Sequence, residues 1–83
     1  MPAAPYAAGH VLLAPREALT EAEVAARLKP LGYGVRRSLG GGVFVVSLPE
    51  GKGVPQALEE LGRLPWVRYV EPDYIRRPYG AGR

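Results

Sequence analysis

Three short apolar runs and one segment of alternating apolar and polar residues have the length of β-strands, and most of them are bounded by glycine or proline. Runs of this kind are typical of strands in a compact domain. The predicted strands are His10–Ala14, Gly34–Leu39, Val43–Leu48 and Trp66–Val70. The turn Gly40-Gly41-Gly42 separates the second strand from the third and predicts that these two form a β-hairpin.

The segment between the first two strands repeats its apolar residues at the spacing of an α-helix. It opens with Thr20-Glu-Ala-Glu23, a capping box in which the Thr20 hydroxyl accepts from the Glu23 amide and the Glu23 carboxylate accepts from the Thr20 amide. Pro30 and Gly32 are expected to end this helix. Its buried face is expected to consist of Val24, Leu28 and Leu31.

A second helix is predicted from about Val54 to Leu64. Pro55 is tolerated because it lies in the first turn, where no amide donor is needed, and Pro65 ends the helix. One apolar stripe follows the helical period along this segment. The stripe consists of Val54, Ala57, Leu58, Leu61 and Leu64.

The resulting order, β-α-β-β-α-β, predicts an α+β fold of the ferredoxin-like type. In this sandwich a four-stranded antiparallel sheet carries both helices on one face. The first and third strands are expected at the centre, since they are apolar on both sides. The second strand is expected at an edge, where the charges of Arg36 and Arg37 discourage pairing with other chains.

Two helices cover only one face of such a sheet, yet apolar residues occupy both sides of the third and fourth strands. Some of them must therefore lie on the uncovered face, and an apolar patch there is typical of a partner surface. Scattered surface valines or a homodimer interface are the alternatives.

With 83 residues, the chain has the length of one domain. We divide it into a flexible lead-in (residues 1–9), a folded domain (10–75) and an extended tail (76–83). Residues 1–75 contain equal numbers of acidic and basic side chains, so the net charge of +3 comes from Arg76, Arg77 and Arg83. The scarcity of Asn and Gln and the many prolines favour a thermophilic source, although GC-rich coding produces the same bias.

No apolar run is long enough to span a membrane, and no signal peptide is visible at the start. The expected location is the cytoplasm if Met1 is the native start. The alternative is secretion as part of a precursor whose leader is missing from this sequence. The free chain is expected to be a monomer.

Candidate catalytic and metal-binding residues are scarce. The chain has no cysteine, one histidine (His10), one threonine and two serines, Ser38 and Ser47, neither of which lies in a nucleophile motif. His10, at the start of a strand, is interpreted as structural or solvated. We therefore expect no enzymatic activity, no cofactor and no metal site.

The segment Tyr69-Val-Glu-Pro-Asp-Tyr74, followed by Ile75-Arg-Arg-Pro-Tyr79, resembles the end of a subtilisin-type propeptide. The resemblance is to the peptidase inhibitor I9 family found at the N-terminus of subtilases. It extends from His10 to Tyr79 and includes the capped helix and the Ser38–Val46 hairpin. It implies an inhibitor, a folding chaperone, or both, for a subtilisin-like serine protease acting in cis or in trans. A cleaved propeptide and an independent inhibitor both remain open.

The resemblance implies that the open sheet face packs on two surface helices of the protease. It further implies that Glu71 and Asp73 cap the N-termini of these helices, where free amides and partial positive charge favour a carboxylate. The residues alone leave an alternative, in which Glu71 pairs with a nearby arginine and Asp73 caps a turn.

The resemblance also implies that the tail enters the substrate cleft of the protease as an added strand. Tyr79 then occupies the primary specificity pocket, and an alternative register places Arg83 there instead. The cleft-binding residues implied are Ile75, Arg76, Arg77, Pro78 and Tyr79.

Two other functions use the same topology. RNA-recognition modules share the β-α-β-β-α-β order, and Gly42-Val-Phe-Val-Val46 loosely matches their third strand. However, only one aromatic residue stands there, and the neutral domain offers no net charge to phosphate, so no nucleic acid is expected as a partner. A ligand-binding regulatory domain is the third candidate, and no residue points to it.

Overall fold

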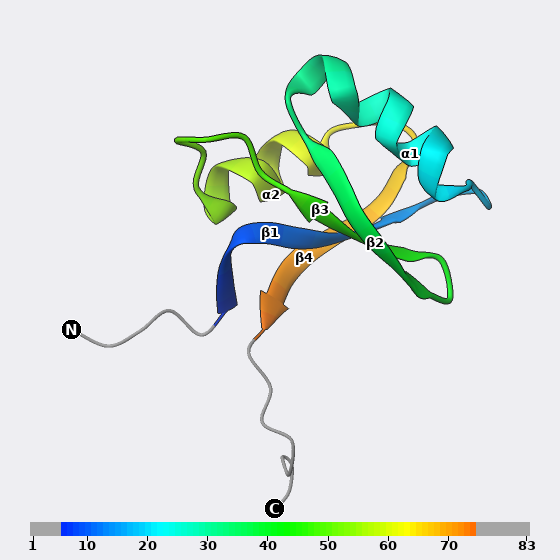
Figure 1. The fold of residues 1–83 in the computed structure, drawn as a ribbon, viewed down its shortest axis with the longest axis horizontal. Helices are drawn as coiled ribbons and strands as arrows, with labels where there is room; N and C mark the ends of the chain where they lie inside the picture. The colour runs from blue at the N-terminus through cyan, green and yellow to red at the C-terminus, as the bar shows by residue number, and fades with distance from the viewer. Residues whose placement is uncertain (1–5, 75–83) are drawn as a thin grey trace, which may run out of the picture.

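The computed structural model describes the backbone of residues 6–74 and the side chains of residues 9–73. Its elements follow the order β1 (Tyr6–Pro15), α1 (Glu21–Leu28), η1 (Lys29–Leu31), β2 (Gly34–Gly40), β3 (Val43–Ser47), α2 (Val54–Gly62) and β4 (Val67–Tyr74). Both α-helices lie on the same side of the sheet (Figure 1). The predicted α+β, ferredoxin-like sandwich is confirmed.

The four strands form one antiparallel sheet in the order β2-β3-β1-β4. As predicted, the first and third strands are central and the strand that carries Arg36 and Arg37 is an edge. β4 is the other edge, which explains how Pro72 can lie within a strand. An edge strand has one side free of partners, so a residue without an amide donor can be accommodated there.

The paired strands β1 and β4 extend further than predicted. β1 begins at Tyr6, so residues 6–9, expected to belong to the flexible lead-in, are part of the sheet. β4 continues to Tyr74, which pairs with Tyr6. Consequently the chain enters and leaves the sheet at the same place, at the lower end of β1 and β4 in Figure 1.

Helix α1 begins at the predicted capping box. The Glu23 amide donates to Thr20 Oγ1 at 3.1 Å, and the Thr20 amide donates to Glu23 Oε1 at 2.8 Å. Two of the amides that every helix leaves unpaired in its first turn are satisfied in this way. Val24 and Leu28 are fully buried on the face that packs against the sheet.

The end of the first helical segment differs from the prediction. Leu31, expected in the core, is 38% exposed, and Tyr33 is buried instead. After Leu28 the chain tightens into the 3₁₀ turn η1, which contains Pro30. Such a turn has about 3.0 residues rather than 3.6, so the spacing that would place Leu31 on the buried face of an α-helix no longer holds.

Tyr33 belongs to a small polar cluster at the edge of the core. Its hydroxyl donates to Glu60 on α2, and Lys52 Nζ lies 2.7 Å from the same carboxylate oxygen. Burial, together with the neighbouring Glu60 carboxylate, raises the pKa of the Tyr33 hydroxyl above its ordinary value. The hydrogen bonds from Lys52 and Tyr33 lower the pKa of Glu60.

The core lies between the two helices and the sheet face that they cover. Helix α2 contributes Val54, Ala57 and Leu61, as its stripe predicted, with Leu58 packed at the margin. The helix ends at Gly62, before the predicted end at Leu64, and Leu64 packs against the core from the turn that follows. The sheet contributes alternate residues of its two central strands. These are Val11 and Leu13 of β1, and Phe44 and Val46 of β3. No buried polar or charged side chain occurs among the described residues.

The β2–β3 hairpin closes through three consecutive glycines with positive φ, Gly40 (86°), Gly41 (63°) and Gly42 (82°). Other residues rarely adopt this conformation, so the triple glycine is what allows the turn. Within residues 6–74, no helix has both the length and the apolar character needed to cross a membrane.

Candidate docking surface

The sheet face opposite the helices carries a row of four residues, one from each strand. Arg37 of β2 pairs with Val45 of β3, Val45 pairs with Leu12 of β1, and Leu12 pairs with Glu71 of β4. Residues directly opposite each other in an antiparallel sheet project to the same side. The row alternates with the core residues of the same strands and therefore lies on the open face.

Apolar residues do occupy the open face, as the sequence predicts. Besides Leu12 and Val45, the pair Ala14 and Tyr69 lies there. Val45 and Ala14 are each only 5% exposed, whereas Tyr69 is 41% exposed and Leu12 is half-buried. Leu12 and Tyr69 therefore leave accessible apolar surface on β1 and β4, next to Glu71.

His10 and Asp73 are in hydrogen-bonding contact across the β1–β4 boundary, with Nε2 and Oδ2 2.6 Å apart, and the contact is an ion pair only when His10 is protonated. His10 is therefore structural, and its partner is one of the two carboxylates for which the family resemblance implies contact with a protease helix. Sequence reasoning missed the pair because 63 positions separate the two residues. Only the β1–β4 register, which local patterns do not determine, brings them together.

Glu71 lies on the same face as Asp73, two residues earlier in the strand, and its surroundings differ. It is exposed, and it has no hydrogen bond or ion pair with any side chain among residues 9–73. The alternative pairing with a nearby arginine is thus not observed within that range. Asp73 caps no turn, since it lies within β4. Of the two carboxylates, Glu71 is the one without a side-chain partner among residues 9–73.

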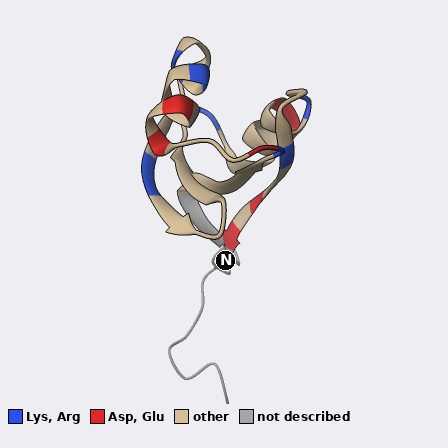
Figure 2. Ribbon diagram, turned by 90° about the vertical axis from the view of Figure 1, so that its right-hand side faces the viewer, with Lys and Arg blue, Asp and Glu red and all other residues tan. Residues whose placement is uncertain are grey.

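Arg36 and Arg37 lie at the opposite edge of the sheet from these acids, and Figure 2 shows the basic strand and the acidic strand on different sides of the molecule. The β2–β3 register pairs Val35 with Val46 and Arg37 with Val45, so Arg36 is an extra residue in a β-bulge. Both arginines line one recess of about 280 Å³, together with His10, Val45 and Asp73.

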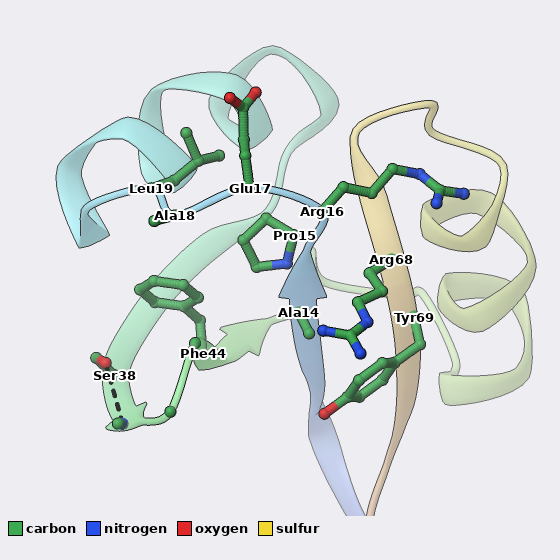
Figure 3. Close-up of a pocket in the computed structure, with 13 residues that line it drawn as sticks. Ala14, Pro15, Arg16, Glu17, Ala18, Leu19, Ser38, Phe44, Arg68 and Tyr69 are labelled. Atoms are coloured by element: carbon green, nitrogen blue, oxygen red, sulfur yellow. Dashed lines mark hydrogen bonds between the residues drawn. The ribbon is translucent and has the colours of Figure 1, made fainter.

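A second hollow, of about 440 Å³, lies where the β2–β3 hairpin faces the segment after β1 (Figure 3). Phe44 lines it from the hairpin side, and Arg68 and Tyr69 extend towards it from β4. Arg16 turns away, and its Nε donates to the Pro65 carbonyl at 3.0 Å. Nothing in this hollow forms a nucleophile–base pair or a metal site. Among the described residues, no group of three potential metal ligands occurs anywhere.

The aromatic residue behind the RNA-recognition alternative points away from the open face. Phe44 is 4% exposed and belongs to the core beneath the helices. An aromatic platform for bases must be accessible on the sheet surface. Phe44 therefore supplies no such platform.

The predicted cleft-binding residues Ile75, Arg76, Arg77, Pro78 and Tyr79 lie outside the described residues, as does Arg83. What the structure does describe is the strand that leads to them. β4 is still extended and paired with β1 at Tyr74.

Comparison with protein families supplies the identity of the domain. Residues 2–73 match the model of the fervidolysin N-terminal prodomain family. The chain belongs to this family. The predicted kinship with subtilase propeptides is thereby confirmed, and the domain is of a propeptide type associated with a subtilisin-like protease. Comparisons with curated proteins and with solved structures gave no significant match.

The family match ends at Asp73, close to the end of β4. It therefore includes the whole open face, with Leu12, Tyr69 and Glu71, and it stops before the tail. The prodomain family accounts for the folded body of the chain, whereas the roles of individual residues depend on the geometry described above.

Proposed function

We propose that this prodomain inhibits a subtilisin-like serine protease and assists its folding, either in cis as part of a precursor or in trans. The open face docks on the enzyme, and the tail occupies the substrate cleft. The observation that carries the proposal is a sheet face, within the residues that match the family, that presents Leu12, Tyr69 and Glu71. The Glu71 carboxylate has no side-chain partner among residues 9–73.

Docking through this face fits its composition. An apolar surface that no helix covers gains free energy when a partner removes it from water. Glu71 lies beside that surface and accepts no hydrogen bond from the described side chains, so its carboxylate is available to the free amides at a helix N-terminus. Asp73, held by His10, contributes by fixing the end of β4 next to β1.

The direction of β4 supports the second half of the proposal. The strand remains extended to Tyr74, at the place where the sheet ends. A continuation in the same conformation presents its backbone donors and acceptors to the cleft by strand addition. Pro78 favours the extended form, and Tyr79 fills the primary pocket, with Arg83 as the alternative occupant.

Assistance in folding follows from the same binding. A domain that binds the native protease and not its unfolded chain stabilises the native state by RT ln(1 + [L]/Kd), which is about 2.7 kcal/mol at a hundredfold excess over Kd. In a precursor the prodomain is covalently attached, so its effective concentration is high. Such a precursor is proposed to be secreted.

Inhibition of a subtilisin-type protease tests the proposal. The full chain is expected to inhibit hydrolysis of a chromogenic peptide, and a chain ending at Tyr74 is expected to inhibit at least tenfold less, because it keeps the sheet and loses the tail. Thermal unfolding of the shortened chain serves as the folding control. No inhibition by the full chain, at any concentration up to the solubility limit, would contradict the proposal.

The two registers of the tail are separated by a pair of substitutions. If Tyr79 fills the primary pocket, Tyr79→Ala raises the inhibition constant severalfold and Arg83→Ala leaves it unchanged. The reverse pattern assigns the pocket to Arg83.

A further inference from the structure

The β-bulge in β2 places two neighbouring arginines on one side of the sheet. In a regular strand, successive side chains point to opposite faces, so Arg36 and Arg37 would be separated. Because the ladder passes from Val35 to Arg37, Arg36 is re-aimed, and both side chains line the recess beside Val45. Bulges commonly serve to redirect a side chain in this way.

Among its described lining residues, the recess contains two arginines and one carboxylate, Asp73. Arginine is charged at any physiological pH. Neither guanidinium forms an ion pair with a carboxylate among residues 9–73, where the contacts between acidic and basic side chains are His10–Asp73, Lys52–Glu60 and Arg63–Glu59. Asp73, the one acid in the recess, is engaged by His10. Two adjacent guanidinium groups offer the forked donors that suit a carboxylate.

The arginines make the charge distribution of the open face asymmetric. Across the row Arg37, Val45, Leu12 and Glu71, the surface changes from basic through apolar to acidic. Its two charged ends are separated by three strand spacings, or about 14 Å. A partner that fits this row has an acidic group facing β2 and a positively polarised group facing β4. If the same partner docked after a rotation of 180° about the normal to the sheet, its acidic group would face Glu71 and its positively polarised group would face Arg37. Specific interfaces avoid such contacts between like charges.

We propose that Arg36 and Arg37 bind an aspartate or glutamate side chain on the surface of the docked protease, and that this contact sets the orientation of docking. The inference rests on the proposed function, and it adds the chemistry that the partner must present opposite β2. Since both arginines are exposed on the edge strand β2, their charge acts on the rate of association as well as on the lifetime of the complex.

Charge reversal in the full chain tests the inference. The double variant Arg36→Glu/Arg37→Glu is expected to raise the inhibition constant against a subtilisin-type protease by about tenfold or more, and to slow association most at low salt. Arg36→Gln/Arg37→Gln is expected to have a smaller effect and a weaker dependence on salt than the unmodified chain. The matched control is Arg63→Glu at the C-cap of α2, on the helix side of the sheet, where Arg63 pairs with Glu59. It is expected to change the constant less than twofold.

A cross-linking experiment identifies the partner group directly. Arg37→Lys keeps the charge and provides an amine that a carbodiimide joins to a carboxylate in contact with it. We expect a cross-link between position 37 and an Asp or Glu of the protease, and none from Arg63→Lys. Because this substitution is conservative, it remains informative if the charge-reversed variant does not fold.

The outcomes distinguish failure of the carboxylate contact from failure of the proposed function. The carboxylate contact alone is overturned if the unmodified chain inhibits, the charge-reversed variant inhibits equally well, and the Arg37→Lys variant gives no cross-link. Loss of single-stranded RNA binding on charge reversal, with inhibition unchanged, also overturns it and assigns the arginines to phosphate. An unmodified chain that does not inhibit overturns the proposed function and this contact with it.

Discussion

Leu12 and Leu13 are neighbours in the same strand and have opposite roles. Leu13 is fully buried beneath the helices, whereas Leu12 is half-buried on the open face, between Val45 and Glu71. Both belong to one apolar run, and only the neighbours provided by the fold distinguish them. The covered face maintains the fold, and the open face retains apolar surface that the isolated domain does not use.

The polar residues also differ between the covered face and the open face of the sheet. The covered face consists of apolar side chains, and no polar side chain is buried among the described residues. The open face carries charge at both edges, with Arg36 and Arg37 on β2 and Glu71 on β4. A surface that combines apolar residues with charged margins has the composition of a protein interface rather than of a core.

The largest expected effect distinguishes the two leucines. Leu13→Ala removes fully buried volume and is expected to lower the free energy of unfolding by about 2–5 kcal/mol. Leu12→Ala removes partly exposed volume and is expected to cost less than about 1.5 kcal/mol, while weakening inhibition of the protease. Urea denaturation followed by circular dichroism measures both. Equal losses of stability would show that the open face is part of the folding core.

The next comparison separates the two carboxylates of β4. Glu71→Gln is expected to raise the inhibition constant by roughly tenfold, equivalent to about 1.4 kcal/mol, with the free energy of unfolding unchanged. Asp73→Asn is expected to lower the free energy of unfolding by up to about 1 kcal/mol, because it breaks the pair with His10.

His10→Ala provides the control for Asp73. If the pair acts as a unit, His10→Ala and Asp73→Asn give similar losses, and the double variant loses less than their sum. Fully additive losses would mean that the contact contributes nothing to stability. A loss of folding in Glu71→Gln would make Glu71 structural and remove it from the docking surface.

The smallest expected effect concerns pH and the covered side of the molecule. The pKa of Glu60 is lowered in the folded state by Lys52 and Tyr33, so its carboxylate stabilises the fold at neutral pH. This stabilisation is expected to be lost as the pH falls below the ordinary range of a glutamate and through the lowered pKa of Glu60. Glu60→Gln should flatten this acid limb of the stability curve, measured by thermal unfolding, and leave inhibition at neutral pH unchanged. An unaltered acid limb would contradict the role of the cluster.

Much of the fold was predictable from residues close together in the sequence. The capping box at Thr20 and the stripe of α2 are determined by neighbours three or four positions away, and both are confirmed. Leu31 was assigned wrongly because a 3₁₀ turn containing Pro30 replaces the last helical turn. The local signals at Pro30 and Gly32 are compatible with either a helix or a 3₁₀ turn, and in the structure the 3₁₀ turn is accompanied by burial of Tyr33.

The candidate site was predictable only in part. The sequence placed Glu71 and Asp73 together and indicated surplus apolar residues on the sheet. It treated Arg36 and Arg37 as charges on an edge and His10 as isolated. A bulge depends on the register of two strands, and the His10–Asp73 pair depends on contact across 63 positions. Neither leaves a pattern in a single strand.

By itself, then, the sequence determined the number, type and order of the elements, because hydrophobic spacing, caps and glycine turns act over a few residues. The tertiary structure decided which side of each strand meets the helices, which carboxylate on β4 contacts His10 and which arginines share a recess. Those choices depend on sheet register, which is fixed only when distant strands pair and bury one face.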